Sequence, residues 1–155
     1  MRKFHIHRDG LKYIIYNPSN GNKGSITLKV KGEKILFEDF SPNGPIATEK
    51  GLGSNAELAV LDDVVERLGT GYVLGHPSPT LARVNHLKKF RARGGTWLNL
   101  CFMVYENIDE YRKKLRSYVE AHSGIEIIWR EPGPSDLYTV MAERAQALKK
   151  RKYWV

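Results

Sequence analysis

The chain has 155 residues, of which 41% are hydrophobic and 27% are charged, and it carries a formal net charge of +8. This size predicts a single domain over residues 1–155, and the composition excludes a disordered chain. No apolar run approaches the roughly 18–20 residues that a membrane helix requires, so no membrane association is expected. The only cysteine is Cys101, which excludes an internal disulfide, and the charged N-terminus lacks the apolar core of a secretory signal. We therefore expect a cytoplasmic, intracellular protein.

The first forty residues are predicted to form a meander of antiparallel strands. Each candidate strand is short and rich in β-branched or aromatic residues, and Asp-Gly, Asn-Gly or Lys-Gly pairs separate one from the next. The expected strands cover residues 3–7, 12–16, 25–30 and 34–40. The first of them falls within residues 1–10, which we interpret as an N-terminal extension of the sheet.

The second half alternates between helical and strand-like segments. Apolar residues recur every three or four positions in the helical segments, and short apolar runs mark the strands. Helices are expected within residues 54–69, 78–95, 107–124 and 137–152, and strands at 72–75 and 125–129. Ser54 and Glu57 fit a capping box at the start of the first helix. Residues 96–105 fit either a strand or the start of a buried helix, and residues 149–155 form a basic tail.

Positive charge is concentrated in two segments of the sequence. Residues 83–93 contain five Lys or Arg side chains together with His86 and no carboxylate, and residues 149–152 are all Lys or Arg. Such clusters are typical of proteins that neutralise the phosphates of a nucleic acid. A solvated helix face and a frayed tail are the alternative interpretation of the same residues.

The order of elements over residues 11–148 resembles the ribonuclease H fold. In that family the first strand of a meander ends in Asp-Gly-Ser, and the sequence NPS from Asn17 occupies the equivalent place here. A helix with an inward glutamate follows, matched by Glu57 in GSNAEL, and the next strand ends in Asp-Ser, matched by HPS from His76. Asp136 is the acid at the start of the last helix. The resemblance implies an α/β (α+β) fold with a mixed five-stranded sheet flanked by helices, plus the N-terminal strand.

The resemblance also implies a metal-dependent nuclease site with an incomplete set of acids. Family members hold two divalent metals with carboxylates, and Mg²⁺ prefers such hard oxygen ligands. Asn17 and His76 stand at the positions of missing acids, which leaves Glu57 and Asp136 as the catalytic candidates. We therefore expect metal-dependent hydrolysis to be lost or much reduced. No cofactor is then expected, or Mg²⁺ or Mn²⁺ if the nuclease is active, and the metal ligands stay unknown.

Each of these candidates also has a structural interpretation. Glu57 can cap its own helix, His76 can be a turn residue, and Asp136 can complement a helix dipole. These roles need no catalysis, so the residue types alone do not decide between the two interpretations.

An alternative register would move the first acid to the N-terminal strand. Asp9 also ends a predicted strand in Asp-Gly, so it is a second candidate for that position. His5 and His7 lie on one face of the same strand, because strand side chains alternate, and such a pair can contribute to a metal site when a third ligand is present.

Binding of an RNA-containing duplex or RNA–DNA hybrid is the function that these features favour. The basic helix would contact phosphates, the first loop would reach sugar hydroxyls, and Trp97 would stack on a base or sugar unless it packs in the core. The predicted contacts are Asn17, Ser19, Asn20, Asn22, Lys88, Lys89, Arg91, Arg93 and Trp97. An active divalent-metal-dependent endoribonuclease is the first alternative. A non-enzymatic assembly factor that binds a protein or ribonucleoprotein through the apolar residues 96–105 is the second.

Overall fold

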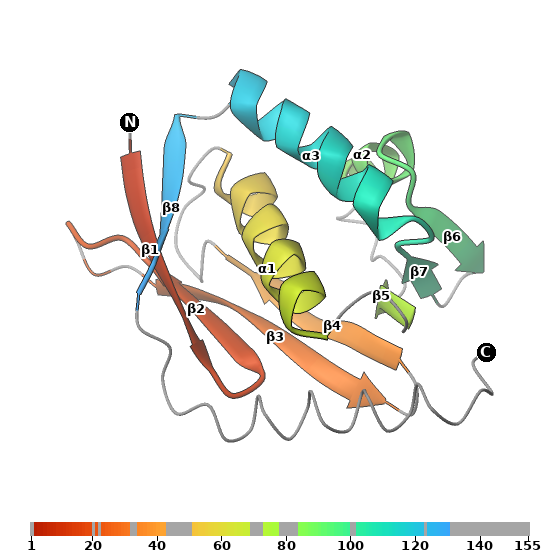
Figure 1. The fold of residues 1–155 in the computed structure, drawn as a ribbon, viewed down its shortest axis with the longest axis horizontal. Coiled ribbons are helices and arrows are strands. Elements are labelled where there is room, and N and C mark those ends of the chain that lie inside the picture. The colour runs from red at the N-terminus through yellow and green to blue at the C-terminus, as the bar shows by residue number, and fades with distance from the viewer. Residues whose placement is uncertain are drawn as a thin grey trace.

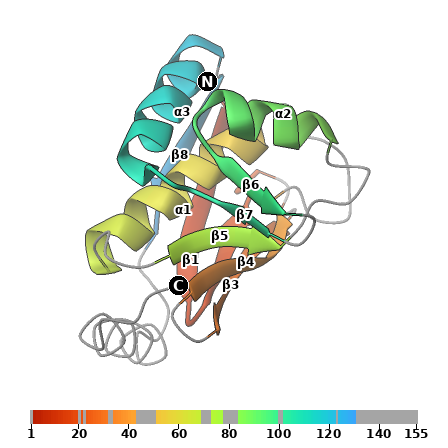
Figure 2. The same ribbon diagram turned by 90° about the vertical axis from the view of Figure 1, so that its right-hand side faces the viewer.

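The computed structural model describes residues 2–19, 21, 23–31, 34–42, 51–68, 73–77, 84–99, 102–122 and 124–130. These residues form an eight-stranded mixed sheet and three helices (Figures 1 and 2). The α+β class expected from the sequence is confirmed. Within these ranges no helix has both the length and the apolar character needed to cross a membrane.

The first four strands follow the predicted meander closely. They pair antiparallel in chain order, each with the next. Their bounds are β1 (Arg2–Asp9), β2 (Lys12–Tyr16), β3 (Lys23–Lys31) and β4 (Lys34–Ser41). Alternate side chains of each strand are buried, as a sheet with one face packed against helices requires.

Helices and short strands make up the rest of the described chain. They are α1 (Leu52–Leu68), β5 (Val73–Pro77), α2 (Val84–Ala92), β6 (Thr96–Asn99), β7 (Phe102–Val104), α3 (Ile108–His122) and β8 (Ile125–Trp129). The strand order across the sheet is β6-β7-β5-β4-β3-β2-β1-β8. Two neighbouring pairs are parallel, β4 with β5 and β1 with β8.

The number of strands differs from the prediction. Five strands plus the N-terminal one were expected, and the described sheet has eight. The two additional strands are β6 and β7, in a segment for which one strand or a buried helix was predicted. They pair antiparallel, with Thr96 opposite Val104 and Trp97 opposite Met103. Two strands this short share a single apolar run, so hydrophobic periodicity does not separate them.

The hydrophobic core lies between one face of the sheet and the helices. Ile26 and Leu28 of β3 are at most 1% exposed, and Leu61 of α1 and Leu115 of α3 are fully buried. Figure 1 shows α1 crossing the sheet with α3 beside it, and the two helices are in contact. Burying these aliphatic side chains supplies the main driving force for docking the helices on the sheet.

The start of α1 differs from the sequence-based prediction. The helix begins at Leu52, so Ser54 is already inside it and the predicted capping box is wrong. Gly51 precedes the helix with a φ of 89°, a left-handed conformation that side chains rarely adopt. The Asn55 side-chain amide donates a hydrogen bond of 2.7 Å to the Gly51 carbonyl and so closes the first turn.

The predicted start of α3 and the predicted end of α2 are confirmed, whereas the predicted start of α2 at residue 78 lies outside the described residues. The Glu110 N–H donates to Oδ1 of Asn107 at 3.1 Å, which caps α3. Gly94 ends α2 with a φ of 100°, and the N–H of Gly95 donates to the Phe90 carbonyl. The predicted helix over residues 137–152 and the basic tail lie outside the described residues.

Candidate functional site

A buried polar cluster is centred on Glu57 of α1. Its side chain is held by hydroxyls from two other elements: Tyr105, which follows β7, donates to Oε2 at 2.9 Å, and Tyr111 of α3 donates to the same oxygen at 2.8 Å. Glu57 is 1% exposed, and the two tyrosines are buried as well. The carboxylate therefore joins α1 to the chain after β7 and to α3.

Two further side chains complete this cluster. The Nε2 atom of His76 lies 2.5 Å from the Tyr105 hydroxyl. Because that hydroxyl donates to Glu57, its oxygen accepts from His76, and this requires a proton on Nε2. Nη1 of Arg93 lies 3.9 Å from Oε1 of Glu57, and the guanidinium of Arg93 stacks over the ring of Tyr118 at 4.8 Å. β5 is thereby linked to the Glu57 carboxylate through Tyr105, and the end of α2 is linked to it through Arg93.

The electrostatics of the cluster favour neutral tyrosines. Burial raises the pKa of Tyr105 well above its ordinary value, and the charge of Glu57 raises it further. The pKa of Tyr111 is raised for the same two reasons, with burial again the larger. Both hydroxyls therefore remain donors to Glu57 over the whole physiological range. A buried carboxylate with two donors and a cation nearby is well satisfied, which suits a group that holds helices together.

The structure brings together two of the four residues that the ribonuclease H resemblance places at a metal site. Glu57 and His76 share Tyr105 as a hydrogen-bond partner. Asn17 lies in the turn after β2, where its Oδ1 accepts from the N–H of Ser19 at 2.9 Å, and none of its described bonds reaches the Glu57 cluster. Asp136 lies outside the described residues.

Possible metal ligands do not gather elsewhere in the described part of the chain. No group of three or more His, Cys, Asp or Glu side chains there has the proximity that a metal ion needs. Asp9 is exposed at the β1–β2 turn. His5 and His7 flank the ring of Tyr16, and Nδ1 of His5 lies 3.3 Å from the Tyr16 hydroxyl.

The predicted nucleic-acid contacts on α2 separate into two groups. Lys88, Lys89 and Arg91 are exposed, as a phosphate-binding surface requires. Arg93 is 7% exposed and points inward to Glu57, so its charge is used inside the fold. Asn17 and Ser19 lie in the β2–β3 turn, whereas Asn20, Asn22 and the Trp97 side chain lie outside what the structure describes.

The apolar segment proposed as a protein-binding surface is partly accounted for by the core. Met103, Val104 and Tyr105 are each at most 6% exposed. These three side chains are therefore unavailable to a partner in the folded protein.

A second feature is the opening between the parallel strands β4 and β5. Their ladder contains three pairs, from Lys34 with Val73 to Leu36 with Gly75, all at the amino ends of the two strands. Beyond Gly75, the described part of β5 pairs with β7 on its other side. β4 continues to Ser41 with β3 on one side and no β5 partner among the described residues on the other.

A β-bulge lies in β4 where the two strands part. Thr27 pairs with Asp39, and Leu28 pairs with Phe37, so Glu38 is an extra residue in β4. A bulge bends and twists its strand, and bulges are common next to active sites. The ring of Phe37 stacks on His76 of β5 at 4.6 Å, and the ring of Phe40, beyond the bulge, lies 6.5 Å from the same histidine. Beyond the three ladder pairs, the β4 edge on the β5 side faces no strand within the described ranges.

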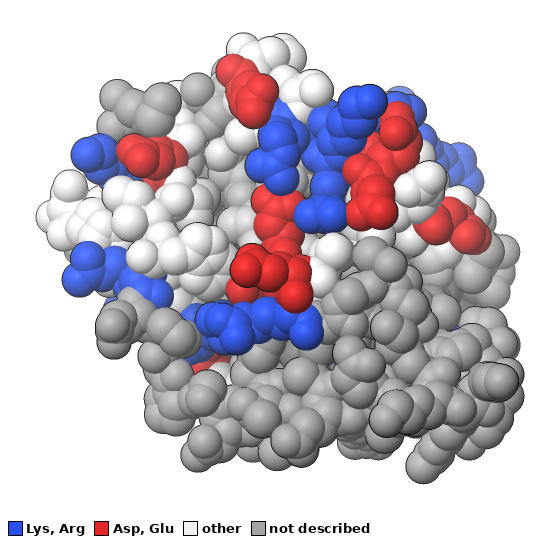
Figure 3. Space-filling model, viewed as in Figure 1, with Lys and Arg blue, Asp and Glu red and all other residues white. Residues whose placement is uncertain are grey.

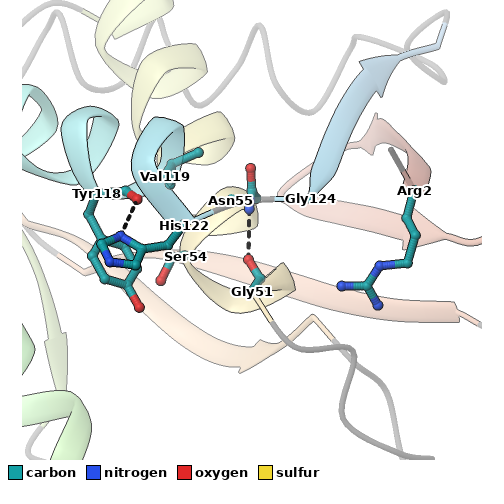
Figure 4. Close-up of a pocket in the computed structure, with 8 residues that line it drawn as sticks. All are labelled: Arg2, Gly51, Ser54, Asn55, Tyr118, Val119, His122 and Gly124. Carbon is teal, nitrogen blue, oxygen red and sulfur yellow. Dashed lines mark hydrogen bonds between the residues drawn. The ribbon is translucent and has the colours of Figure 1, made fainter.

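A cavity lies beside the first turn of α1 (Figure 4). It measures about 410 Å³, and Figure 4 shows Arg2 on one side of it with Tyr118 and His122 on the other. Gly51, Ser54 and Asn55 of the helix start lie between them. None of the described residues that line the cavity is a carboxylate, and the first turn of α1 contains no acidic residue. This combination of an arginine, a hydroxyl and a helix N-terminus favours an anionic ligand group.

No family model, curated protein or solved structure matches the chain.

Sequence reasoning missed the opening and the helix start as a possible site. Residues 41–53 are rich in Gly and Pro, a composition that indicates only a connecting loop. The available signal was the GLGS sequence from Gly51, two glycines with one residue between them at the start of a helix. Such glycines allow a ligand to approach the backbone closely. The separation of β4 from β5 has no comparable signal, because strand neighbours are set by the whole sheet.

Proposed function

We propose that the protein binds a coenzyme A thioester and transfers its acyl group to an amine. The observation that carries this proposal is the parallel β4–β5 ladder, which has three residue pairs among the described residues and ends next to the Glu38 bulge. An exposed strand edge recruits ligands that have amide groups in an extended chain, because each amide replaces a missing ladder hydrogen bond. The pantetheine arm of coenzyme A is such a chain, and it ends in the thiol that carries the acyl group.

The start of α1 suits the other end of the same ligand. Coenzyme A carries phosphates beyond its pantetheine arm, and phosphates bind favourably at the N-termini of helices. Here the helix start lies beside the cavity lined by Arg2, Ser54 and His122. We propose that one ligand reaches from the helix start to the β4 edge.

The architecture supports the proposal through a likeness of fold. An antiparallel meander, followed by a helix and a parallel strand that diverges from the last meander strand, is similar to the arrangement in acyl-coenzyme A-dependent N-acyltransferases. Fold alone does not establish function, so the main support for the proposal comes from the end of the β4–β5 ladder and from the start of α1. In the described sheet, β7 and β6 lie beyond β5 at one edge, and β8 lies beyond β1 at the other.

The chemistry needs little from the protein beyond position and polarity. The amine nitrogen attacks the thioester carbonyl carbon and forms the C–N bond, the C–S bond breaks, and the sulfur leaves as a thiolate. The nitrogen loses one proton and the thiolate takes one up, by exchange with water, so that the products are an amide and a free thiol. Backbone N–H groups along the open edge of β4 can stabilise the negative charge that develops on the carbonyl oxygen. Holding both reactants in line supplies a further large part of the rate enhancement.

Equilibrium binding to three ligands tests the proposal. We expect coenzyme A to bind more tightly than either pantetheine, which lacks the phosphates, or ADP, which lacks the arm. The reason is that each fragment keeps only one of the two contact regions. Release of free thiol from acetyl-coenzyme A on addition of a primary amine would establish transfer. Equal affinity for coenzyme A and ADP would contradict a role for the β4 edge.

A second candidate is the ribonuclease H-like protein that the sequence resembles, with hydrolysis lost or much reduced. The observation that favours it is the proximity of Glu57 and His76. The fully buried state of Glu57 ranks it second, since a metal and a phosphate would have to enter the core. Cleavage of an RNA–DNA hybrid with Mg²⁺ or Mn²⁺, abolished in Glu57→Gln but kept in Glu66→Gln on the exposed side of α1, would reverse this order.

A further inference from the structure

Positive charge is concentrated on the exposed side of α2. Lys88, Lys89 and Arg91 are exposed on this helix, and residues 67–105 contain no Asp or Glu at all. In contrast to these lysines, many cations of α1, α3 and β1 are already paired. Arg112 and Arg116 bind Asp62 of α1 at 2.9 and 2.8 Å.

The rest of the described surface shows mixed charge. Figure 3 shows Lys and Arg side chains interleaved with Asp and Glu over the face that carries α1 and α3. Arg8 and Arg67 lie 3.3 and 3.4 Å from the Asp63 carboxylate, which neutralises a further part of the positive charge. Among the described residues, no ion pair involves Lys88 or Lys89. The positive potential of these two lysines is therefore not cancelled by their described neighbours.

The opposite side of α2 is firmly anchored. Phe90 is fully buried, with its ring 5.0 Å from that of Tyr105 and 5.3 Å from that of Tyr111. Arg93 holds the end of the helix to Glu57, and a Cβ at Gly95 would overlap the Phe90 ring, so the chain turns tightly there. The exposed lysines thus project from a backbone of fixed position, which lowers the ordering cost of binding.

We infer that the exposed side of α2 binds the phosphate backbone of a nucleic acid. Lysine side chains without nearby carboxylates neutralise phosphates and release condensed counterions, and this release dominates the affinity of sequence-independent binding. The inference does not depend on the proposed acyl transfer.

Two double variants of equal charge test the inference. Lys88→Gln with Lys89→Gln removes two adjacent cations from α2, and Lys113→Gln with Lys114→Gln removes two adjacent exposed cations from α3. Binding of a mixed-sequence duplex would be measured by fluorescence anisotropy at increasing KCl. We expect the α2 variant to lower the slope of log affinity against log salt by about 1.8, or about 0.9 for each phosphate that is no longer neutralised. The α3 variant is expected to keep the slope of the unmodified protein.

Three outcomes would overturn the inference. The first is no binding, or binding that is independent of salt, by the unmodified protein. The second is an equal reduction of the slope in both variants, which would indicate diffuse charge without a defined surface. The third is equal competition by polyglutamate at the same concentration of charge, which would indicate an acidic protein partner. Gly53→Glu, which targets the coenzyme A site, is expected to leave duplex binding unchanged and so separates the two proposals.

Discussion

The two polar regions of α1 differ in whether their polar groups are buried and hydrogen-bonded or border a cavity. In the second turn of the helix, Glu57 is 1% exposed and accepts hydrogen bonds from two tyrosine hydroxyls, with Arg93 close by. Three residues earlier, Ser54 faces a cavity of about 410 Å³ together with the helix start. The closed region uses its polar groups to join elements, whereas the open region borders a cavity with the start of the helix. The tyrosines with raised pKa values therefore belong to the structural cluster. The proposed ligand site is instead recognised by its cavity.

The largest expected effect is a loss of stability when Glu57, at the centre of the buried cluster, is replaced by an uncharged residue. Glu57→Gln leaves the buried Arg93 without its anion, so we expect a decrease of about 3–5 kcal/mol in the free energy of unfolding, measured with urea. Glu66→Gln, on the exposed side of the same helix, is the matched control and should stay within about 0.5 kcal/mol. A decrease below about 1 kcal/mol for Glu57→Gln would show that the cluster does not hold the helices together.

Alkaline pH should weaken the same region. The native pKa values of Tyr105 and Tyr111 are raised, so the folded protein keeps two protons that the unfolded chain releases above about pH 10. The contribution is fully present below that pH and falls as pH rises toward the native values, by about 1.4 kcal/mol per pH unit for each tyrosine.

Urea unfolding from pH 8 to 11.5 measures this effect. Lysine and arginine titration also acts in this range, so the comparison is between the unmodified protein and Tyr111→Phe. The variant should show a shallower decline, by about 1.4 kcal/mol per pH unit. Parallel declines in the two proteins would show that Tyr111 ionises as readily in the native state as in the unfolded chain.

The smallest effect is expected for the exposed ion pairs between α1 and α3. Asp62 binds Arg112 and Arg116, but its side chain is 32% exposed. Solvent and salt screen such pairs, so Asp62→Asn should cost less than about 1 kcal/mol and still less in 1 M salt. Thermal unfolding at two salt concentrations checks both points. A cost close to that of Glu57→Gln would remove the distinction between buried and exposed carboxylates of this helix.

The sequence predicted the helices and strands better than it predicted which of them lie next to one another in space. The strand at 12–16 was predicted with its observed bounds, because turn glycines and β-branched residues are local signals. The resemblance placed Glu57 correctly on an inward helix face. Its partners Tyr105 and Tyr111 lie 48 and 54 residues away, so no local pattern predicts the cluster.

The pairing of β4 with β5 was also not predictable from local pattern. A strand's propensity reflects burial and side-chain shape, and it does not identify the neighbouring strand. Once α1 returns the chain next to β4, only three pairs form among the described residues, and the edge opens beyond them. The predicted five-strand arrangement did not include the end of the β4–β5 ladder. The function proposed from the structure therefore differs from the one predicted from the sequence.

The most direct test of coenzyme A binding is calorimetric titration of this ligand into two variants at one position. A Cβ at Gly53, in the first turn of α1, meets no atom within 4 Å, so Gly53→Ala fits sterically and the side chain of Gly53→Glu starts in open space. A carboxylate at a helix N-terminus stabilises the helix, so Gly53→Glu should fold at least as well as the unmodified protein. We predict that Gly53→Ala binds coenzyme A within about threefold of the unmodified protein, while Gly53→Glu binds at least about tenfold more weakly because its charge repels the phosphates. Equal affinity of the two variants, or no binding by the unmodified protein, would contradict the proposed function.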